Sequence, residues 1–177
     1  MSSTASVRRD FVEFWGSLGS YWGIPPATAR VYAWLVSQPE PRTADDIVAG
    51  LDMSRGAVSM AGRELRDWGL VHVERASGSR QIVYRPETDL ELAIRNIVQT
   101  RKRREWDPLL ARLRAWIAEL DGQRSAEAEL FRERLRSIEA LVAMADSMAE
   151  SFLKGGMVPK LGLKFLVASA RRRRGRK

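Results

Sequence analysis

Three arginines and a serine between residues 55 and 66 have the side chains and the spacing needed to bind a nucleic acid. A guanidinium group can donate two parallel hydrogen bonds to a guanine edge or to a phosphate, and a serine hydroxyl can reach either. At 100° per residue, one band of a helix would carry Arg55, Ser59, Arg63 and Arg66. An ordinary solvated helix face is the alternative interpretation. The elements predicted before and after this helix distinguish between the two.

The segments around this band predict a helix-turn-helix. Thr43 is a good N-cap for a short helix, which ends at the two-residue link formed by Asp52 and Met53. Ser54 then caps a second helix, and Gly69 ends it, because glycine readily adopts the left-handed conformation of a C-cap. The small apolar side of this second helix consists of Val58, Ala61, Gly62 and Leu65.

Two β-prone runs follow, at residues 71–74 and 81–84, on either side of a glycine-containing tip at residues 76–79. This order of elements predicts a mainly α fold of the α+β type, a winged helix-turn-helix with a small β-hairpin as its wing. Arg75 and Arg80 bracket the tip, where arginine can contact the DNA backbone or enter the minor groove. A solvated hairpin whose charges prevent edge-strand aggregation is the alternative.

The second helix and the wing together form the predicted DNA-binding surface. We expect Arg55, Ser59, Met60 and Arg63 at base edges, because they occupy the exposed band or lie beside it. Arg66, Arg75 and Arg80 are expected on phosphate or in the minor groove. The full predicted set is Thr43, Ser54, Arg55, Gly56, Ser59, Met60, Arg63, Arg66, Arg75, Ser79 and Arg80.

Residues 22–107 resemble the MarR-type winged-helix transcriptional regulators, in particular their GbsR-like branch. The matching stretches are WGIPPATARVYAWL, SRGAVSMAGRELRDWGLV and GSRQIVYR. The resemblance implies a cytoplasmic, prokaryotic homodimer that binds a pseudo-palindromic DNA operator and represses transcription. It implies neither the operator sequence nor the inducer, and the C-terminal tail is not part of the family's pattern.

The chain contains no cysteine and a single histidine, His72. Disulfides, thiolate metal sites and a cysteine nucleophile are therefore excluded, and no second histidine exists to build a nucleophilic relay or a usual zinc site. His72 lies between Val71 and Val73, which we expect to face the core, so His72 should point to solvent or DNA. We therefore predict no enzyme activity, no catalytic residues, no metal and no cofactor.

The net charge of +8 suggests a polyanionic partner, but its distribution is uneven. Residues 171–177 contribute six positive charges, which leaves +2 for the rest of the 177 residues. No apolar run approaches the roughly 20 residues of a membrane span, and no secretion signal is recognisable. These patterns agree with the cytoplasmic location that the resemblance implies, and the winged helix is expected to be basic through arrangement and not through excess charge.

The predicted organisation is a disordered N-terminus at 1–7, a flanking helix at 8–20, the winged helix-turn-helix at 21–87, connecting and dimerisation helices at 88–155, an apolar segment at 156–170 and a polybasic tail at 171–177. Asp107 and Pro108 mark either a kink or a new helix start. The tail is interpreted as an arm that reaches DNA phosphates; a membrane anchor and a solubility tail are the alternatives.

Apolar stripes in the flanking helices predict an antiparallel helical hairpin. Part of each stripe must be core within one chain, and the excess is expected to form a homodimer interface, because a winged helix already has its own core. The predicted dimerisation residues are Phe11, Phe14, Trp15, Leu113, Trp116, Leu120, Leu135, Ile138 and Val142.

Four aromatic residues form a candidate effector cage, namely Trp34, Trp68, Tyr84 and Trp106. Aromatic faces can hold a quaternary ammonium compound by cation–π attraction, and the resemblance to GbsR-like regulators suggests such an inducer. Ordinary core packing of the four rings is the alternative. Two other classes of function compete with a DNA-binding regulator: a winged-helix module that binds protein, and a membrane-associated adaptor that uses the tail.

Overall fold

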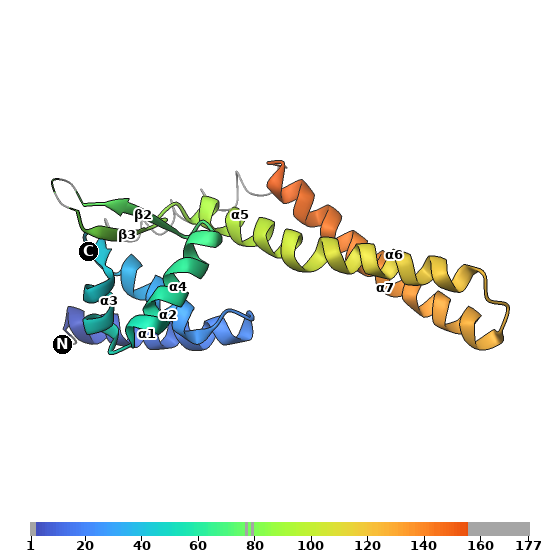
Figure 1. Ribbon diagram of the computed structural model, residues 1–177, viewed down its shortest axis with the longest axis horizontal. Coiled ribbons are helices and arrows are strands. Elements are labelled where there is room, and N and C mark those ends of the chain that lie inside the picture. Colours follow the sequence, from blue (N-terminus) through green and yellow to red (C-terminus); the bar gives the residue numbers. More distant parts are fainter. Residues whose placement is uncertain (1–2, 77, 79, 156–177) are drawn as a thin grey trace, which may run out of the picture. The chain divides into compact units, whose positions relative to one another are not determined.

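In the computed structural model, which describes residues 3–76, 78 and 80–155, the chain divides into the units Met1–Asn96 and Ile97–Lys177. The first unit contains α1 (Thr4–Tyr21), α2 (Pro26–Val36), β1 (Arg42–Thr43), α3 (Ala44–Leu51), α4 (Arg55–Asp67), β2 (Val71–Arg75) and β3 (Ile82–Pro86) (Figure 1). Helix α5 (Leu90–Arg101) crosses the boundary; η1 (Lys102–Trp106), α6 (Asp107–Asp121) and α7 (Ala126–Leu153) follow. The predicted segments 156–170 and 171–177 lie outside the described residues.

The core of the first unit lies between α2, α3 and α4. Its most deeply buried large side chains are Leu35, Ile47, Val31, Val58 and Val71. The turn between α3 and α4 passes through Asp52, which adopts the left-handed conformation with φ of 51°. Asp and Asn tolerate this conformation better than most residues, so the two-residue link can form without glycine. The predicted helix-turn-helix is therefore present.

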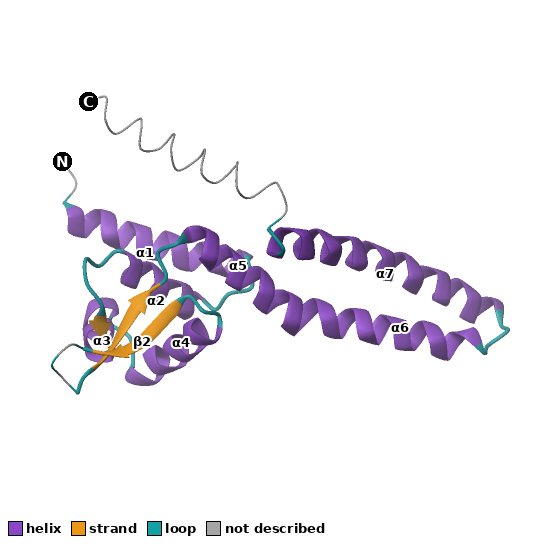
Figure 2. Ribbon diagram, turned by 90° about the horizontal axis from the view of Figure 1, so that it is seen from above, coloured by secondary structure: helices purple, strands orange, loops and turns teal. Residues whose placement is uncertain are grey.

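The sheet has three antiparallel strands in the order β1-β3-β2. Val73 pairs with Tyr84 across the hairpin, and Thr43 pairs with Val83 on the other edge of β3. Figures 1 and 2 show the strands of the hairpin lying alongside the helices of their unit. Val71 is buried at the base of the hairpin, whereas Val73, expected in the core, is exposed. The wing and its helices confirm the predicted fold class.

Helix α1 begins earlier than expected and packs on α2. Ser3 caps it by accepting a hydrogen bond from the backbone N–H of Ser6. Residues 4–7 are therefore the first turns of a helix, and the prediction of disorder over 1–7 is wrong for them, because a capped start was overlooked. A side chain at Gly19 would bring its Cβ within 2.6 Å of the Cβ of Ala29, so glycine permits the close approach of the two helices.

The second unit has no helix break at Asp107–Pro108 within its described residues. The chain instead passes through η1, where the N–H of Asp107 donates to the carbonyl of Lys102, five residues earlier. A wider turn immediately before Pro108 accommodates the ring and its missing N–H. The Lys102 ammonium donates to Asp107 (2.8 Å) and to Asp146 on α7 (2.6 Å), and these bonds raise the pKa of Lys102.

Helices α6 and α7 run side by side as the predicted antiparallel hairpin (Figure 2). Leu113 is 2% exposed and Leu135 is 5% exposed within a single chain. Both were predicted to contact a second copy, and this is wrong: they form the core of the hairpin itself. Ala128 and Ala149, seven residues before and fourteen residues after Leu135, share this inward position on α7. Among the described residues, no helix combines the length and apolar character needed to cross a membrane.

Candidate nucleic-acid interface

Helix α4 presents its basic band to solvent because its opposite face is buried. Val58, Ala61, Gly62 and Leu65 form the buried side, as the periodicity predicts. Ser59, Arg63 and Arg66 are exposed, and Met60 beside them is 71% exposed. Ser54 caps the helix, its hydroxyl accepting a hydrogen bond from the N–H of Ala57 at 3.2 Å. The helix is thus held by its apolar side and leaves its polar side free to meet a ligand.

The wing packs on α4 through a glycine. A Cβ added at Gly62 would lie 2.8 Å from Cε1 of Tyr84, so the ring of this β3 residue sits directly against the backbone of α4. Any larger residue at position 62 would push the sheet away from the helix. Gly62 and Tyr84 therefore set the spacing between the basic band and the wing.

The two sides of the helix-turn-helix are joined by an ion pair that sequence reasoning missed. Arg55, the first residue of α4, lies 3.0 Å from Asp45 in the first turn of α3. Both side chains are largely exposed, at 80% and 68%. Asp45 also stands in the first turn of α3, where the helix dipole favours an acidic side chain. Its spacing from Arg55 depends on the tight turn and is not visible in the sequence pattern.

Thr43 has a capping role that occupies its hydroxyl. The hydroxyl accepts a hydrogen bond from the N–H of Asp46 and donates to the carboxylate of Asp46, at 3.2 and 2.8 Å. The N–H of Thr43 donates to the same carboxylate, which completes a capping box. These bonds, the backbone one first, lower the pKa of Asp46. The cap accounts for Thr43 without the DNA contact predicted for it.

We expect Thr43→Ala to lower the free energy of unfolding by about 0.5–2 kcal/mol, the usual cost of losing an N-cap. Thr43→Ser should retain most of that stability, because its hydroxyl can make the same bonds. Chemical denaturation of the three proteins measures the effect, with Thr88→Ala, an exposed threonine, as the matched control. Unchanged stability combined with weaker duplex binding would instead assign Thr43 to the DNA surface.

The tip of the wing carries the two predicted cations in exposed positions. Arg75 ends β2, Arg80 precedes β3, and both are exposed. Gly78 between them has φ of 72°, which favours glycine in this tight connection. Ser79, a further predicted DNA contact, lies outside the described residues. Lower on the wing, Arg85 donates to Glu74 across the strands at 2.6 Å, so this arginine already has an anionic partner.

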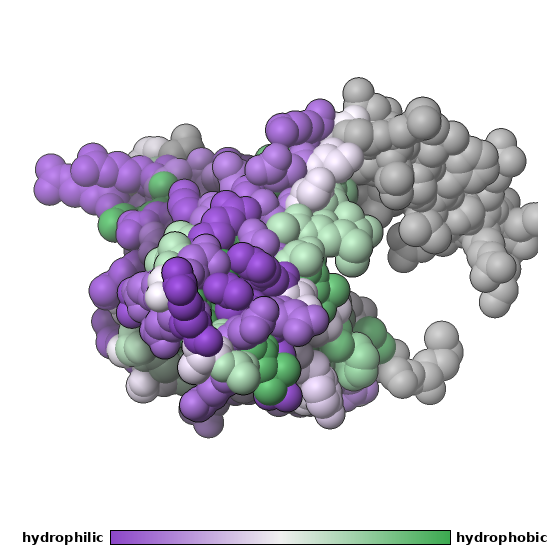
Figure 3. Space-filling view, turned by 90° about the vertical axis from the view of Figure 1, so that its right-hand side faces the viewer, coloured by the Kyte–Doolittle hydropathy of each residue, from purple (hydrophilic) through white to green (hydrophobic). Residues whose placement is uncertain are grey.

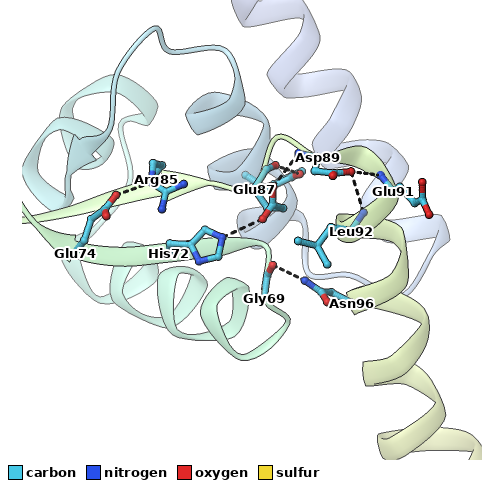
Figure 4. A network of polar contacts seen from close by, with 10 residues as sticks. Gly69, His72, Glu74, Arg85, Glu87, Asp89, Glu91, Leu92 and Asn96 are labelled. Carbon is cyan, nitrogen blue, oxygen red and sulfur yellow. Dashed lines mark hydrogen bonds and ion pairs between the residues drawn. The ribbon is translucent and has the colours of Figure 1, made fainter. Parts of the chain in front are cut away.

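A polar network at the base of the wing joins the strands to α2 and to the start of α5 (Figure 4). The Glu87 carboxylate accepts a hydrogen bond from the N–H of Asp89 at 2.8 Å, and its other oxygen lies 3.1 Å from Nε2 of His72. These two partners, in that order, lower the pKa of Glu87. The Tyr32 hydroxyl donates to the Glu87 carbonyl, and burial raises the pKa of Tyr32. His72 therefore points to the surface, as predicted, but its ring contacts Glu87 at the base of the wing.

The end of the recognition helix is also tied to α5. The Asn96 side chain donates to the carbonyl of Gly69 at 2.9 Å, directly after α4 (Figure 4). Gly69 has φ of 65°, as its predicted C-cap role requires, and a Cβ there would approach Asn96 Nδ2 to 2.7 Å. The two residues lie 27 positions apart in the chain, so no local sequence pattern signals this contact. It links the position of α4 to the helix that leads into the second unit.

The four residues of the predicted aromatic cage occupy different surroundings. The ring of Trp34 lies against Gly50 of α3, and the ring of Tyr84 lies against Gly62 of α4. Trp68 is buried at the end of α4, and Trp106 belongs to the second unit. Trp34 lines a cavity whose walls include neither Trp68 nor Tyr84. Within the first unit Trp34 and Tyr84 thus rest on different helices, α3 and α4, and the aromatic cage stays a prediction.

Comparisons with known proteins agree on the fold alone. No protein-family model matches the chain, and no curated protein matches it. A crystal structure described as that of a transcriptional regulator is similar to this chain, with a TM-score of 0.65 and 19% sequence identity. The match covers 83% of this chain and 95% of the other. The chain thus shares its architecture with a regulator, and the narrower resemblance to MarR-type and GbsR-like proteins stays a prediction.

Proposed function

We propose that this protein is a cytoplasmic transcriptional regulator that binds double-stranded DNA in a sequence-specific manner, as a homodimeric repressor on a pseudo-palindromic operator. The observation that carries the proposal is the exposed basic band of α4, anchored by a buried apolar side and capped by Ser54. A helix held in this way can enter a major groove, and the wing arginines Arg75 and Arg80 can contact the adjacent backbone.

The homodimer is supported by an apolar face of α7 that the hairpin leaves uncovered. Leu141 is 63% exposed, and the exposed large side chains on this helix are Leu130, Phe131, Ile138, Leu141, Met144 and Met148. Hydrophobic patches also stand among mostly hydrophilic residues on the surface seen in Figure 3. A cluster of exposed apolar side chains on one side of a helix is typical of a protein interface. Of the earlier set, Ile138 lies on this face, and Trp116 and Phe14 are exposed elsewhere.

In vitro selection of duplexes bound by the full chain tests the proposed function. The expected result is a consensus with two inverted half-sites whose centres are about one helical turn, or a multiple of it, apart. Affinity should fall as salt rises, because arginine contacts release counterions from the phosphates. Failure to enrich any sequence, with no salt-dependent binding to duplex DNA, would favour a winged-helix module that binds protein.

Replacing Asp45 with asparagine is expected to raise affinity for DNA. The change frees Arg55 from its carboxylate partner and removes a negative charge beside the recognition helix. The gain should be small, up to about fivefold, because an exposed ion pair is worth roughly 0.2–1 kcal/mol. Fluorescence anisotropy with a labelled duplex measures it, and Glu40→Gln is the matched control, an exposed acid elsewhere in the same unit. Equal affinity of Asp45→Asn and the unmodified protein would place Arg55 away from the duplex.

A further inference from the structure

Helix α4 carries a large apolar side chain, Met60, on its outward side, where it is 71% exposed. At 100° per residue, Gly56, Met60 and Arg63 lie together on the side of the helix opposite its buried residues. A single exposed apolar residue is ordinary on a protein surface. The neighbouring positions on the same side of α4 therefore have to show whether Met60 meets a partner.

Gly56, one turn before Met60, is a glycine that the packing of the described residues does not require. A Cβ added there would meet only Oγ of Ser54, at 4.0 Å, which is an ordinary contact distance. The other glycine of α4, Gly62, is by contrast held in place by the ring of Tyr84. Glycine is a poor helix former, and the φ of Gly56 is not in the left-handed region. An exposed helix position without a side chain suits the close approach of another molecule.

The charges around this part of α4 suit a polyanion. The first two turns of the helix carry no acidic side chain. The carboxylate of Asp45 on α3 reaches them, but it lies 3.0 Å from the guanidinium of Arg55 and is paired with it. Glu64 lies further along α4, where its carboxylate accepts a hydrogen bond from the Thr28 hydroxyl at 2.6 Å. Asp67 is the last residue of the helix, two turns beyond Met60.

The chemistry of Met60 restricts what it can recognise in a major groove. The base edges there present hydrogen-bond donors and acceptors, and the 5-methyl group of thymine is the one apolar group among them. A thioether is a weak acceptor and no donor, so Met60 cannot bond to the polar groups as Ser59 and Arg63 can. Its unbranched, flexible side chain can adapt its reach to a methyl group on the groove floor.

We propose that Met60 recognises a thymine through its 5-methyl group, and that the missing side chain of Gly56 lets the duplex come close enough for this contact. The inference rests on the proposed function and adds to it the base that this part of α4 selects. Each half-site of the operator therefore contains a thymine at the position that Met60 reaches.

Replacing single thymines of the selected duplex by deoxyuridine tests the methyl contact. Uracil pairs as thymine does and lacks only the methyl group. At one position in each half-site, the replacement should lower the affinity of the full chain about fourfold, the value of one methyl group removed from water. In Met60→Ala the same replacement should have no effect. Fluorescence anisotropy with the labelled duplexes measures both ratios.

Arg80→Ala is the matched control for Met60→Ala, because it removes a different expected DNA contact, on the wing. It should bind the thymine and uracil duplexes more weakly by the same factor and so keep the fourfold ratio between them. A selected half-site without thymine would overturn the methyl contact. Equal sensitivity to uracil in Met60→Ala and in the unmodified protein would overturn it as well.

Gly56→Ala tests the close approach, because it should change stability and affinity in opposite directions. Alanine is the better helix former and its Cβ has room, so the midpoint of thermal unfolding should rise. Affinity for the selected duplex should fall roughly 5- to 150-fold, the usual cost of forcing extra methyl groups into a packed contact. Unchanged affinity together with a higher midpoint would overturn the role of Gly56.

Gly122→Ala is the matched control for this glycine. Gly122 belongs to the second unit, has φ of −82°, and an added Cβ there would meet no described atom within 4 Å. Its replacement should leave the affinity for the selected duplex unchanged. A loss of affinity as large as that of Gly56→Ala would show that the effect does not arise from contact with DNA at α4.

The outcomes separate this inference from the proposed function. A duplex that is selected and bound, but is insensitive to the loss of every thymine methyl, would overturn the role of Met60 and leave DNA binding in place. If no duplex is selected or bound at all, the proposed function fails and the inference fails with it. The exposed side of α4 would then belong to a surface for a protein partner.

Discussion

Replacing Arg63 with alanine is expected to reduce the discrimination between the selected duplex and a scrambled one. Arg63 lies in the middle of the exposed band of α4, opposite the buried side that anchors the helix. A bidentate contact between arginine and a base is worth about 1–3 kcal/mol of discrimination, which corresponds to roughly 5- to 150-fold in the specificity ratio. Competition binding with the two duplexes measures this ratio directly.

The matched control for Arg63 is an arginine of the wing. Arg80→Ala removes the same charge from an exposed position next to the tip, where a contact to phosphate or the minor groove is expected. It should weaken binding to both duplexes by similar factors and so preserve the specificity ratio. If Arg63→Ala preserved the ratio as well, α4 would not be the element that reads the base sequence.

Introducing two carboxylates into the uncovered face of α7 should abolish the homodimer. Ile138 and Leu141 are both exposed in the single chain, so Ile138→Asp with Leu141→Asp should leave the α6–α7 hairpin folded. At a dimer interface the same carboxylates would be buried without partners, at a cost of several kcal/mol each. Sedimentation should show a monomer, and affinity for a two-half-site duplex should collapse because both recognition helices no longer bind together.

Two positions on another face of the same helix provide the control. Ala140→Asp with Ser147→Asp adds the same two charges to exposed residues that lie away from the apolar face. This variant should remain a dimer and bind the selected duplex. A dimer of unchanged stability for Ile138→Asp with Leu141→Asp would show that the second copy does not cover this face of α7.

The sequence by itself determined the recognition helix, its two faces and its ends. The period of 3.6 residues assigns Val58 and Leu65 to one side and Arg63 to the other without any knowledge of the neighbours. The caps at Ser54 and Gly69 are equally local, because an N-cap hydroxyl and a left-handed glycine act within three residues of themselves. The same locality explains why the hairpin of β2 and β3 was predicted near its observed position.

The tertiary structure alone decided which apolar residues belong to the core and which polar residues pair with each other. Helix α7 carries apolar side chains on more than one face, and only packing against α6 placed Leu135 inside and left Ile138 outside. The pairs Arg55–Asp45 and Asn96–Gly69 join residues from different elements, at distances that depend on a turn geometry. Aromatic side chains pack into the space that the surrounding backbone leaves open. The ring of Trp34 therefore takes its position from the missing side chain of Gly50 and not from its own sequence neighbours.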